Sequence, residues 1–597
     1  MLARVPPAIL AALWICATAL SAAPPPILKL DDVRPGMRGV GKTTFEGTRI
    51  AEFEVEVVGV LREIGPDQDL ILARCTGGPL AETRILSGMS GSPVFIDGRL
   101  IGAIAYSWGF STDSIAGITP IEEMLAVAAR DRAAGSARQA ATGPFERLGP
   151  DLDADVLAEF FRSRWASAFA PGSAGIAPLT LPVSIAGLPP AGFAALAPVL
   201  GNAGFLAVQG GSGAAAAGSP PPLEPGSAIG VKLVRGDVEI AATGTVTWVD
   251  GDRILAFGHP LFGLGDVDFP MTAARVEALL PSLMQSARLA TPLAEVGALR
   301  QDRPSAVAGA LGAGAAMIPV RLQYQGADGV RASYAFDLVA DPVLAPVLLY
   351  YTLNGVLAGR DRAVGSLSLR LAEGSVIRLR DEGDIALDNV FSGTTATAYA
   401  TGIGAFVLHL LLNNAWSPPR VEGINLILEY ASAPRAARIR RVTLDRYRAR
   451  PGDAVRASVV LQPYRGPDVV VEREIRIPDE TPPGTLTLTA GSADAVSRPE
   501  AGEEPVAPRD LQQFVFVVNN LRRNDRVYVV AGRDDDGALV GGARLPNLPP
   551  SAAAVLTRPA THGNVTIIRR RGILEDSIPT QYAVEGSARI ELEVEAP

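Results

Sequence analysis

Hydrophobic and polar positions alternate along much of the chain, and this pattern predicts a protein built mainly from β-strands. Residues 51–61 read AEFEVEVVGVL, with glutamates at positions 52, 54 and 56 and apolar residues between them. A period of two is typical of a strand with one buried and one exposed face. Further strands are predicted over residues 94–96, 100–106, 241–249, 318–325, 332–339 and 367–371.

Helical patterns are few. Apolar residues recur at helical spacing over residues 157–165 and 511–521, and the apolar run 405–412 around His409 also predicts a helix. Residues 210–226 read GGSGAAAAGSPPPLEPG, which is the composition of a linker. A second change in composition near Pro434 precedes a region that we expect to be β-sandwich-like with one helix.

These features divide the chain into five parts. We expect a targeting segment, a unit with a serine motif, short helices with the linker, a β-rich unit with a histidine motif, and a C-terminal β-rich domain. The corresponding ranges are 1–23, 27–130, 131–225, 226–434 and 435–597.

The first 23 residues read MLARVPPAILAALWICATALSAA and have the order of a secretory signal peptide. Arg4 precedes an apolar run and small residues follow it. The run is shorter than the roughly 20 residues of a membrane span. We therefore expect a periplasmic or extracellular protein. Cleavage and retention of the segment as an anchor both stay open, as does peripheral association with the membrane.

Composition excludes several classes of function. The net charge of −9 provides no basic field for nucleic acid. Two cysteines, Cys16 and Cys75, are too few for a disulfide framework or a Cys-rich zinc module. Three histidines, His259, His409 and His562, exclude a His-rich metal centre. We expect neither a metal nor an organic cofactor.

Residues 36–43 read GMRGVGKT and fit the letters of a phosphate-binding loop. That motif needs a helix directly after the loop, because the helix N-terminus holds the phosphates. Here Gly47 and then the alternating strand 51–61 follow. We therefore expect a β-turn region of a small barrel and no nucleotide.

The most informative segment surrounds Ser90. Residues 85–109 read ILSGMSGSPVFIDGRLIGAIAYSWG. Gly88 and Gly91 allow the tight turn that a nucleophilic serine needs, and Asp97-Gly98 predicts a hairpin. The alternative interpretation is an ordinary Gly/Ser turn before a hairpin.

The segment resembles the trypsin-like pattern GDSGGP, strand, turn, strand, SWG. It is more similar to the stage IV sporulation protein B (SpoIVB) serine peptidase family, whose nucleophile lies in GMSGSP, as residues 88–93 read. The family's second signature is similar to residues 243–252, TGTVTWVDGD, with 254–259, ILAFGH. The resemblance implies a trypsin-like double β-barrel unit built from two separated segments, with Ser90 as nucleophile and His259 as general base.

The resemblance has further implications for substrate binding. It assigns the oxyanion-hole N–H groups to Gly88 and Ser90, and the substrate groove to residues 107–109. Arg84 would approach the specificity pocket and favour acidic side chains.

The chain departs from the family in two ways. Ser90 precedes His259, whereas the family has the reverse order, and the place of the orienting aspartate falls on Cys75. The third residue is therefore open, and a Ser–His dyad without an acid is a further alternative. The acidic candidates are Glu82, Asp69, Asp266 and Asp268.

Together these observations predict an exported serine endopeptidase that acts on a protein or peptide substrate, either an envelope protein or the chain itself. The alternative is a catalytically inactive scaffold or binding protein of the cell envelope that keeps the peptidase fold.

Overall fold

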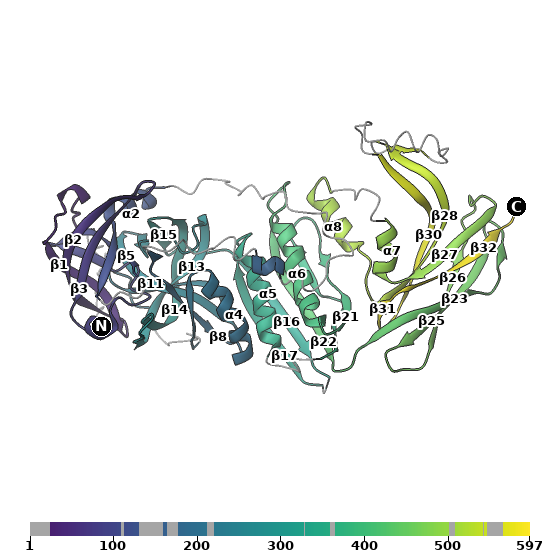
Figure 1. Cartoon of the computed structure of the whole chain (residues 1–597), viewed down its shortest axis with the longest axis horizontal. Coiled ribbons are helices and arrows are strands. Elements are labelled where there is room, and N and C mark those ends of the chain that lie inside the picture. The colour runs from purple at the N-terminus through teal and green to yellow at the C-terminus, as the bar shows by residue number, and fades with distance from the viewer. Residues whose placement is uncertain are drawn as a thin grey trace, which may run out of the picture.

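The computed structural model describes residues 24–108, 113–130, 159–163, 177–211, 220–327, 329–358, 365–500, 508–540, 543–545 and 565–596. The predicted signal peptide and His562 lie outside these residues. Strands dominate the described part, and the mainly β fold class is confirmed (Figure 1). The first barrel lies at one end of the molecule and the C-terminal sheets at the other.

The first barrel is a closed ring of strands in the order β4-β1-β2-β3-β6-β5, in which β5 pairs back onto β4. Most of residues 36–43 lie within β1, which turns at Gly47 into β2, so a strand is present where a phosphate-binding loop would need a helix. Asp97 and Gly98 both have positive φ and make the predicted hairpin between β4 and β5. The elements are η1 (Leu30–Asp32), β1 (Arg38–Glu46), β2 (Arg49–Gly65), β3 (Gln68–Thr76), α1 (Leu80–Thr83), β4 (Pro93–Ile96), β5 (Arg99–Ser107), β6 (Ile115–Pro120) and α2 (Ile121–Ala128).

A second barrel follows, with the strand order β10-β13-β14-β15-β12-β11 and closure by pairing of β10 with β11. Its strands are β10 (Ala228–Gly236), β11 (Glu239–Asp250), β12 (Arg253–Ala256), β13 (Gly265–Leu280), β14 (Ala287–Arg303) and β15 (Ala306–Leu311). Two closed barrels side by side are the trypsin-like arrangement. The serine and histidine segments each belong to their own barrel.

The range 131–225, expected to hold short helices and a linker, also contains strands. They are β7 (Ala177–Pro178), β8 (Leu181–Ala186) and β9 (Phe205–Gln209), with helix α4 (Pro190–Asn202) between the last two. Every residue of β8 is buried. A strand covered on both faces shows no alternation, which is why the sequence pattern missed it.

The sheet of the second barrel continues through β17 into a layer covered by α5 and α6 (Figure 1). Helix α5 is apolar on nearly all sides because it is buried, so it shows no amphipathic stripe and was not predicted. His409 is buried in α6, in the helix predicted around it. No helix in the described part of the chain is long and apolar enough to span a membrane. The elements are β16 (Met317–Gln325), β17 (Arg331–Val339), α5 (Leu344–Leu357), β18 (Leu367–Leu371), β19 (Val376–Leu379), β20 (Ile385–Ala386), β21 (Asn389–Gly393), α6 (Ala396–Leu412) and β22 (Val421–Ala431).

The C-terminal part contains two sheets that share one apolar core, as expected of a β-sandwich. One sheet has the order β26-β25-β23-β31, and the other contains β24, β32, β27, β28, β29 and β30. The strands are β23 (Ala436–Leu444), β24 (Arg448–Ala449), β25 (Ala454–Pro463), β26 (Val469–Arg476), β27 (Gly484–Gly491), β28 (Arg526–Val540), β29 (Ala543–Leu545), β30 (Val565–Pro579), β31 (Ala583–Glu585) and β32 (Ser587–Val594). The predicted helix is α8 (Leu511–Asn519), and α7 (Ala493–Glu500) is an additional one.

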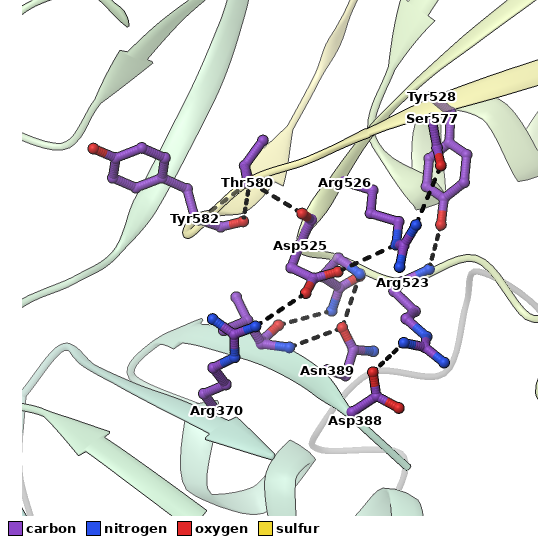
Figure 2. A network of polar contacts seen from close by, with 12 residues as sticks. Arg370, Asp388, Asn389, Arg523, Asp525, Arg526, Tyr528, Ser577, Thr580 and Tyr582 are labelled. Carbon is purple, nitrogen blue, oxygen red and sulfur yellow. Dashed lines mark hydrogen bonds and ion pairs between the residues drawn. The ribbon is translucent and has the colours of Figure 1, made fainter. Parts of the chain in front are cut away.

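A polar network joins this sandwich to the central layer (Figure 2). Arg523 pairs with Asp388, and Arg370 lies 3.7 Å from a carboxylate oxygen of Asp525. A cavity of about 540 Å³ lies beside the network. The ion pairs of Arg523 with Asp388 and of Arg370 with Asp525 therefore join the sandwich to the central layer.

Candidate active site

Ser90 lies on the turn between α1 and β4 of the first barrel, and two glycines shape that turn. Gly88 and Gly91 have φ of +96° and +92°, a backbone conformation that residues with a Cβ rarely adopt. A Cβ at Gly91 would lie 2.0 Å from the carbonyl oxygen of Thr245 and 2.5 Å from the amide nitrogen of Phe257. Because position 91 is glycine, the serine turn can pack directly against the backbone of the second barrel.

His259 follows strand β12 of the second barrel, and the residue before it, Gly258, is bonded to the first barrel. Gly258 has φ of +70°, its carbonyl accepts a hydrogen bond from Thr119 Oγ1 at 2.6 Å, and a Cβ there would lie 3.0 Å from that of Ala105. Ser90 and His259 thus approach one another from separate barrels. Either chain order is compatible with this arrangement, because triads are defined by geometry and not by order.

The two side chains are in hydrogen-bond contact. Nε2 of His259 lies 2.8 Å from Oγ of Ser90, and Nδ1 lies 2.8 Å from the carbonyl oxygen of Pro260. A carbonyl only accepts hydrogen bonds, so Nδ1 carries the proton and Nε2 presents its lone pair to the serine hydroxyl. This is the polarity that a general base needs.

The contact between Ser90 and His259 is closed to solvent. Ser90 is 0% exposed and His259 is 2% exposed. Burial lowers the pKa of His259 to about 4, and the nearby backbone groups of Pro260 and Leu179 partly oppose this shift. The imidazole is therefore neutral, and able to accept a proton, near pH 7.

The acidic candidates for a third residue have other partners. Asp69 pairs with Arg62, Asp266 pairs with Arg303, and Asp268 pairs with Arg300. Glu82 is an exposed residue of α1. Both ring nitrogens of His259 are engaged by Ser90 and Pro260, so the arrangement is a Ser–His dyad.

Cys75, at the position of the family's aspartate, is buried in β3, and burial raises the pKa of its thiol to about 12. The thiol is therefore protonated near pH 7 and supplies no negative charge to orient an imidazolium.

An acid that the sequence did not point to supports the dyad indirectly. The buried carboxylate of Asp302 accepts hydrogen bonds from the amides of Leu261 at 2.8 Å, Phe262 at 2.8 Å and Leu264 at 3.1 Å. Burial raises the pKa of Asp302, and these amides oppose that shift. Asp302 thereby holds the turn that begins with Pro260, whose carbonyl orients His259.

Two amides in the serine turn have no acceptor. The N–H groups of Met89, Gly91 and Ser92 donate to backbone carbonyls. Within the described part of the chain, those of Gly88 and Ser90 have no hydrogen-bond partner. Unpaired donors beside a nucleophile are suited to stabilising an oxyanion.

Arg288, on β14, holds the other side of the serine turn and was also missed. Its guanidinium donates to the carbonyls of Gly88, Thr44 and Gly244, the last two at 2.7 and 3.1 Å. Burial lowers its pKa to about 9. The available sequence signal was one charged residue within an apolar stretch, residues 287–293, ARLATPL. Because Arg288 binds the Gly88 carbonyl, it fixes the orientation of the peptide before Met89.

The described residues contain no group of three or more His, Cys, Asp or Glu side chains that could hold a metal ion.

Comparison with known proteins identifies the first barrel. No curated protein and no solved structure matches the chain. One family model, described as SpoIVB peptidase S55, matches residues 17–125. The match contains all six strands of the first barrel with Ser90 and ends before His259. Residues 17–125 of the chain therefore form a SpoIVB-like domain similar to the S55 peptidases, and this match supports a serine peptidase.

Proposed function

We propose that the chain is an exported serine endopeptidase that cleaves envelope proteins or itself, with Ser90 as nucleophile and His259 as general base. The observation that carries this proposal is the 2.8 Å contact between Ser90 Oγ and His259 Nε2, with Nδ1 directed to the Pro260 carbonyl. The family match supports the reaction class, and the geometry supports the roles proposed for Ser90 and His259.

The reaction follows from these positions. Ser90 Oγ attacks the carbonyl carbon of the substrate peptide while His259 Nε2 takes the hydroxyl proton. The negative charge that develops on the carbonyl oxygen is stabilised by the N–H groups of Gly88 and Ser90. Protonated His259 then gives its proton to the leaving amine, which leaves an ester on Ser90. Water, deprotonated by the same imidazole, hydrolyses this ester and restores the serine.

Export rests on the order of charge and hydrophobicity in residues 1–23. The site of action would be the periplasm or the exterior, with peripheral attachment to the membrane if the segment is retained. The partner is a protein or peptide, and neither a nucleic acid nor a nucleotide is part of the proposal.

A second function is an inactive scaffold that keeps the peptidase fold. The complete burial of Ser90 favours it, because the hydroxyl is closed to substrate in this conformation. The absence of a carboxylate on His259 Nδ1 also favours it, since a triad acid normally stabilises the imidazolium.

A fluorophosphonate probe, which reacts with activated serines, separates the two functions. The purified exported protein is incubated with the probe for hours, and the modified residue is mapped by mass spectrometry. Labelling at Ser90 that is lost in Ser90→Ala supports the peptidase. The matched control is Ser92→Ala, because Ser92 is equally buried but bonds to Thr43 and Met89 instead of histidine.

A correctly folded protein that is never labelled would support the scaffold. To exclude mere coverage of the serine, the experiment is repeated with the variants of Leu179 described below.

A further inference from the structure

Strand β5 has an edge that the first barrel does not use. Strand β4 pairs with residues 99–103 and the serine turn bonds to Ile104, so the same edge of β5 is open beyond Ile104. Strand β7 fills it in antiparallel register, with Ala177 opposite Ser107 and Pro178 opposite Tyr106. The amide of Leu179 then donates to the carbonyl of Ala105 at 2.8 Å. An added strand on a free edge is a common way of binding an extended peptide.

This edge lies directly beside the catalytic pair. Gly91, next to Ser90, donates its N–H to the carbonyl of Ile104 at 2.7 Å. Gly258, next to His259, packs against Ala105. Ala105, whose carbonyl accepts the hydrogen bond from Leu179, therefore follows the residue that binds the serine turn, and its Cβ packs against the histidine turn.

Residues 177–186, which contain β7 and β8, run past Ser90 and His259 from the first barrel to the second. The backbone of Leu179 lies close enough to His259 to raise the pKa of its ring. Beyond it, Pro182 Cγ lies 3.3 Å from the position of a Cβ on Gly88, and β8 pairs with β11 of the second barrel. A peptide substrate of a double-barrel peptidase would have to follow the same route between the barrels.

The side chain of Leu179 occupies an apolar site. It is 3% exposed and belongs to the buried cluster of the first barrel that includes Leu86, Met89 and Ile104. Met89 immediately precedes the nucleophile. This site therefore suits an aliphatic side chain beside the reacting bond.

Building on the proposed function, we propose that the edge of β5 at residues 105–107 binds the substrate strand and that residues 177–181 occupy it as an internal pseudosubstrate. Leu179 takes the place of the residue before the scissile bond. In this state the peptidase is closed, and its substrates are extended segments with an aliphatic residue at that place. This preference differs from the acidic one that Arg84 implied.

The segment is held in a form that blocks the site and is not cut. The oxyanion donors, the amides of Gly88 and Ser90, have no partner in the described part of the chain. The amide of Leu179 is bonded to the carbonyl of Ala105, and within the described part of the chain no carbonyl of residues 177–181 accepts a hydrogen bond from these donors. A carbonyl outside the oxyanion site is not activated for attack by Ser90.

The test compares the rate of Ser90 labelling by the fluorophosphonate in the full exported chain and its variants. Leu179→Pro removes both the side chain and the N–H donated to Ala105, whereas Leu179→Ala removes the side chain alone. The matched control is Leu188→Ala, a buried leucine of the same segment that packs against Gly355. Circular dichroism and thermal unfolding establish that each variant is folded.

We expect labelling about tenfold or more faster in Leu179→Pro, less acceleration in Leu179→Ala and none in Leu188→Ala, because the rate scales with the population of the open state. Equal rates in all folded variants, with labelling still dependent on Ser90, would overturn the pseudosubstrate and leave the proposed function intact. Absence of labelling in every variant would overturn the proposed function and this inference with it. A Ser90-dependent cut after Leu179 in the wild-type chain would overturn the blocking role.

The side-chain preference has a test of its own on the Leu179→Pro variant, or on Leu179→Ala if the first does not fold. Two fluorogenic amides are compared, acetyl-Ala-Pro-Leu and acetyl-Ala-Pro-Asp, which differ only before the scissile bond. Faster hydrolysis of the leucine peptide supports the assignment of Leu179. Equal or faster hydrolysis of the aspartate peptide overturns that assignment without affecting Ser90 as nucleophile.

Discussion

The carbonyl oxygen of Pro260 lies 2.8 Å from Nδ1 of His259, where the carboxylate of a catalytic triad would be expected. A carbonyl fixes the tautomer of the ring as a carboxylate does, but it carries no full charge to stabilise the imidazolium. The acid of this site, Asp302, acts indirectly, because it binds the backbone amides of the turn that begins with Pro260. Orientation of the ring by Pro260 and support of the turn by Asp302 can therefore be tested separately.

Asp302→Asn should slow Ser90 labelling by about 10²-fold, a typical cost of small displacements of a catalytic group. The amide has one acceptor oxygen in place of two, and its NH₂ group faces amide donors. The measurement is the labelling rate across pH, because misplacement of His259 also changes its surroundings and hence its titration.

Asp266→Asn is the matched control, since Asp266 pairs with Arg303 and not with the histidine turn. If both variants lose stability equally and neither changes the labelling rate or its pH profile, Asp302 is a structural residue only.

The pH dependence of labelling should have its acidic limb near pH 4, well below the ordinary histidine range. Only neutral His259 can accept the serine proton, and burial lowers its pKa to about 4. In Leu179→Pro, entry of water should move the limb upward, toward about 6.5. An unshifted limb near 6.5 in the wild-type protein would show that the histidine is solvated.

The same shift predicts a loss of stability in acid. The pKa of His259 is about 4 in the folded chain and about 6.5 when unfolded, so the unfolded state binds a proton first as the pH falls. Relative to His259→Gln, wild type should lose roughly 2–3 kcal/mol of unfolding free energy between pH 7 and pH 4.5. Urea unfolding measures this difference, and parallel curves for the two proteins would contradict it.

Arg288→Met should destabilise the chain by several kcal/mol, because each buried carbonyl left without a donor costs about 1–3 kcal/mol. Its partners include the carbonyls of Gly88, Thr44 and Gly244. Arg288→Lys should fold better but remain slow in labelling, since one ammonium cannot serve acceptors on several strands.

The control for this pair is Arg275→Ala on β13, an exposed arginine paired with Glu277, where a change within about 0.5 kcal/mol is expected. Full labelling in Arg288→Lys would mean that the serine turn keeps its shape without the guanidinium.

Gly91→Ala should destabilise the protein by more than about 3 kcal/mol, because its Cβ would meet the carbonyl oxygen of Thr245 at 2.0 Å. Gly98→Ala is the control. It has a positive φ too, but no heavy atom lies within 4 Å of its Cβ, so only the roughly 1–2 kcal/mol of backbone strain applies. Equal losses in thermal unfolding would refute close approach of the barrels at Gly91.

The sequence predicted some of the elements and missed others. The strand expected over residues 367–371 coincides with β18, and the helix predicted from residue 511 begins there as α8. Strand β8 and helix α5 are buried all round, so their burial removed the periodic signal that prediction uses.

Within the site, Ser90 and His259 could be named because each lies in a local motif. Asp302 and Arg288 could not, because both act through backbone groups that are remote in sequence. The docking of the two barrels through Gly91 is likewise a tertiary contact that no local pattern records.

Activation of Ser90 by His259 can be measured as the rate at which a fluorophosphonate modifies Ser90 in Leu179→Pro, with and without His259→Ala in the same chain. We expect rapid modification at Ser90 and a loss of about 10³-fold or more when the imidazole is removed, within the range expected of a positioned general base. Modification of Ser90 at the same rate without His259 would contradict it.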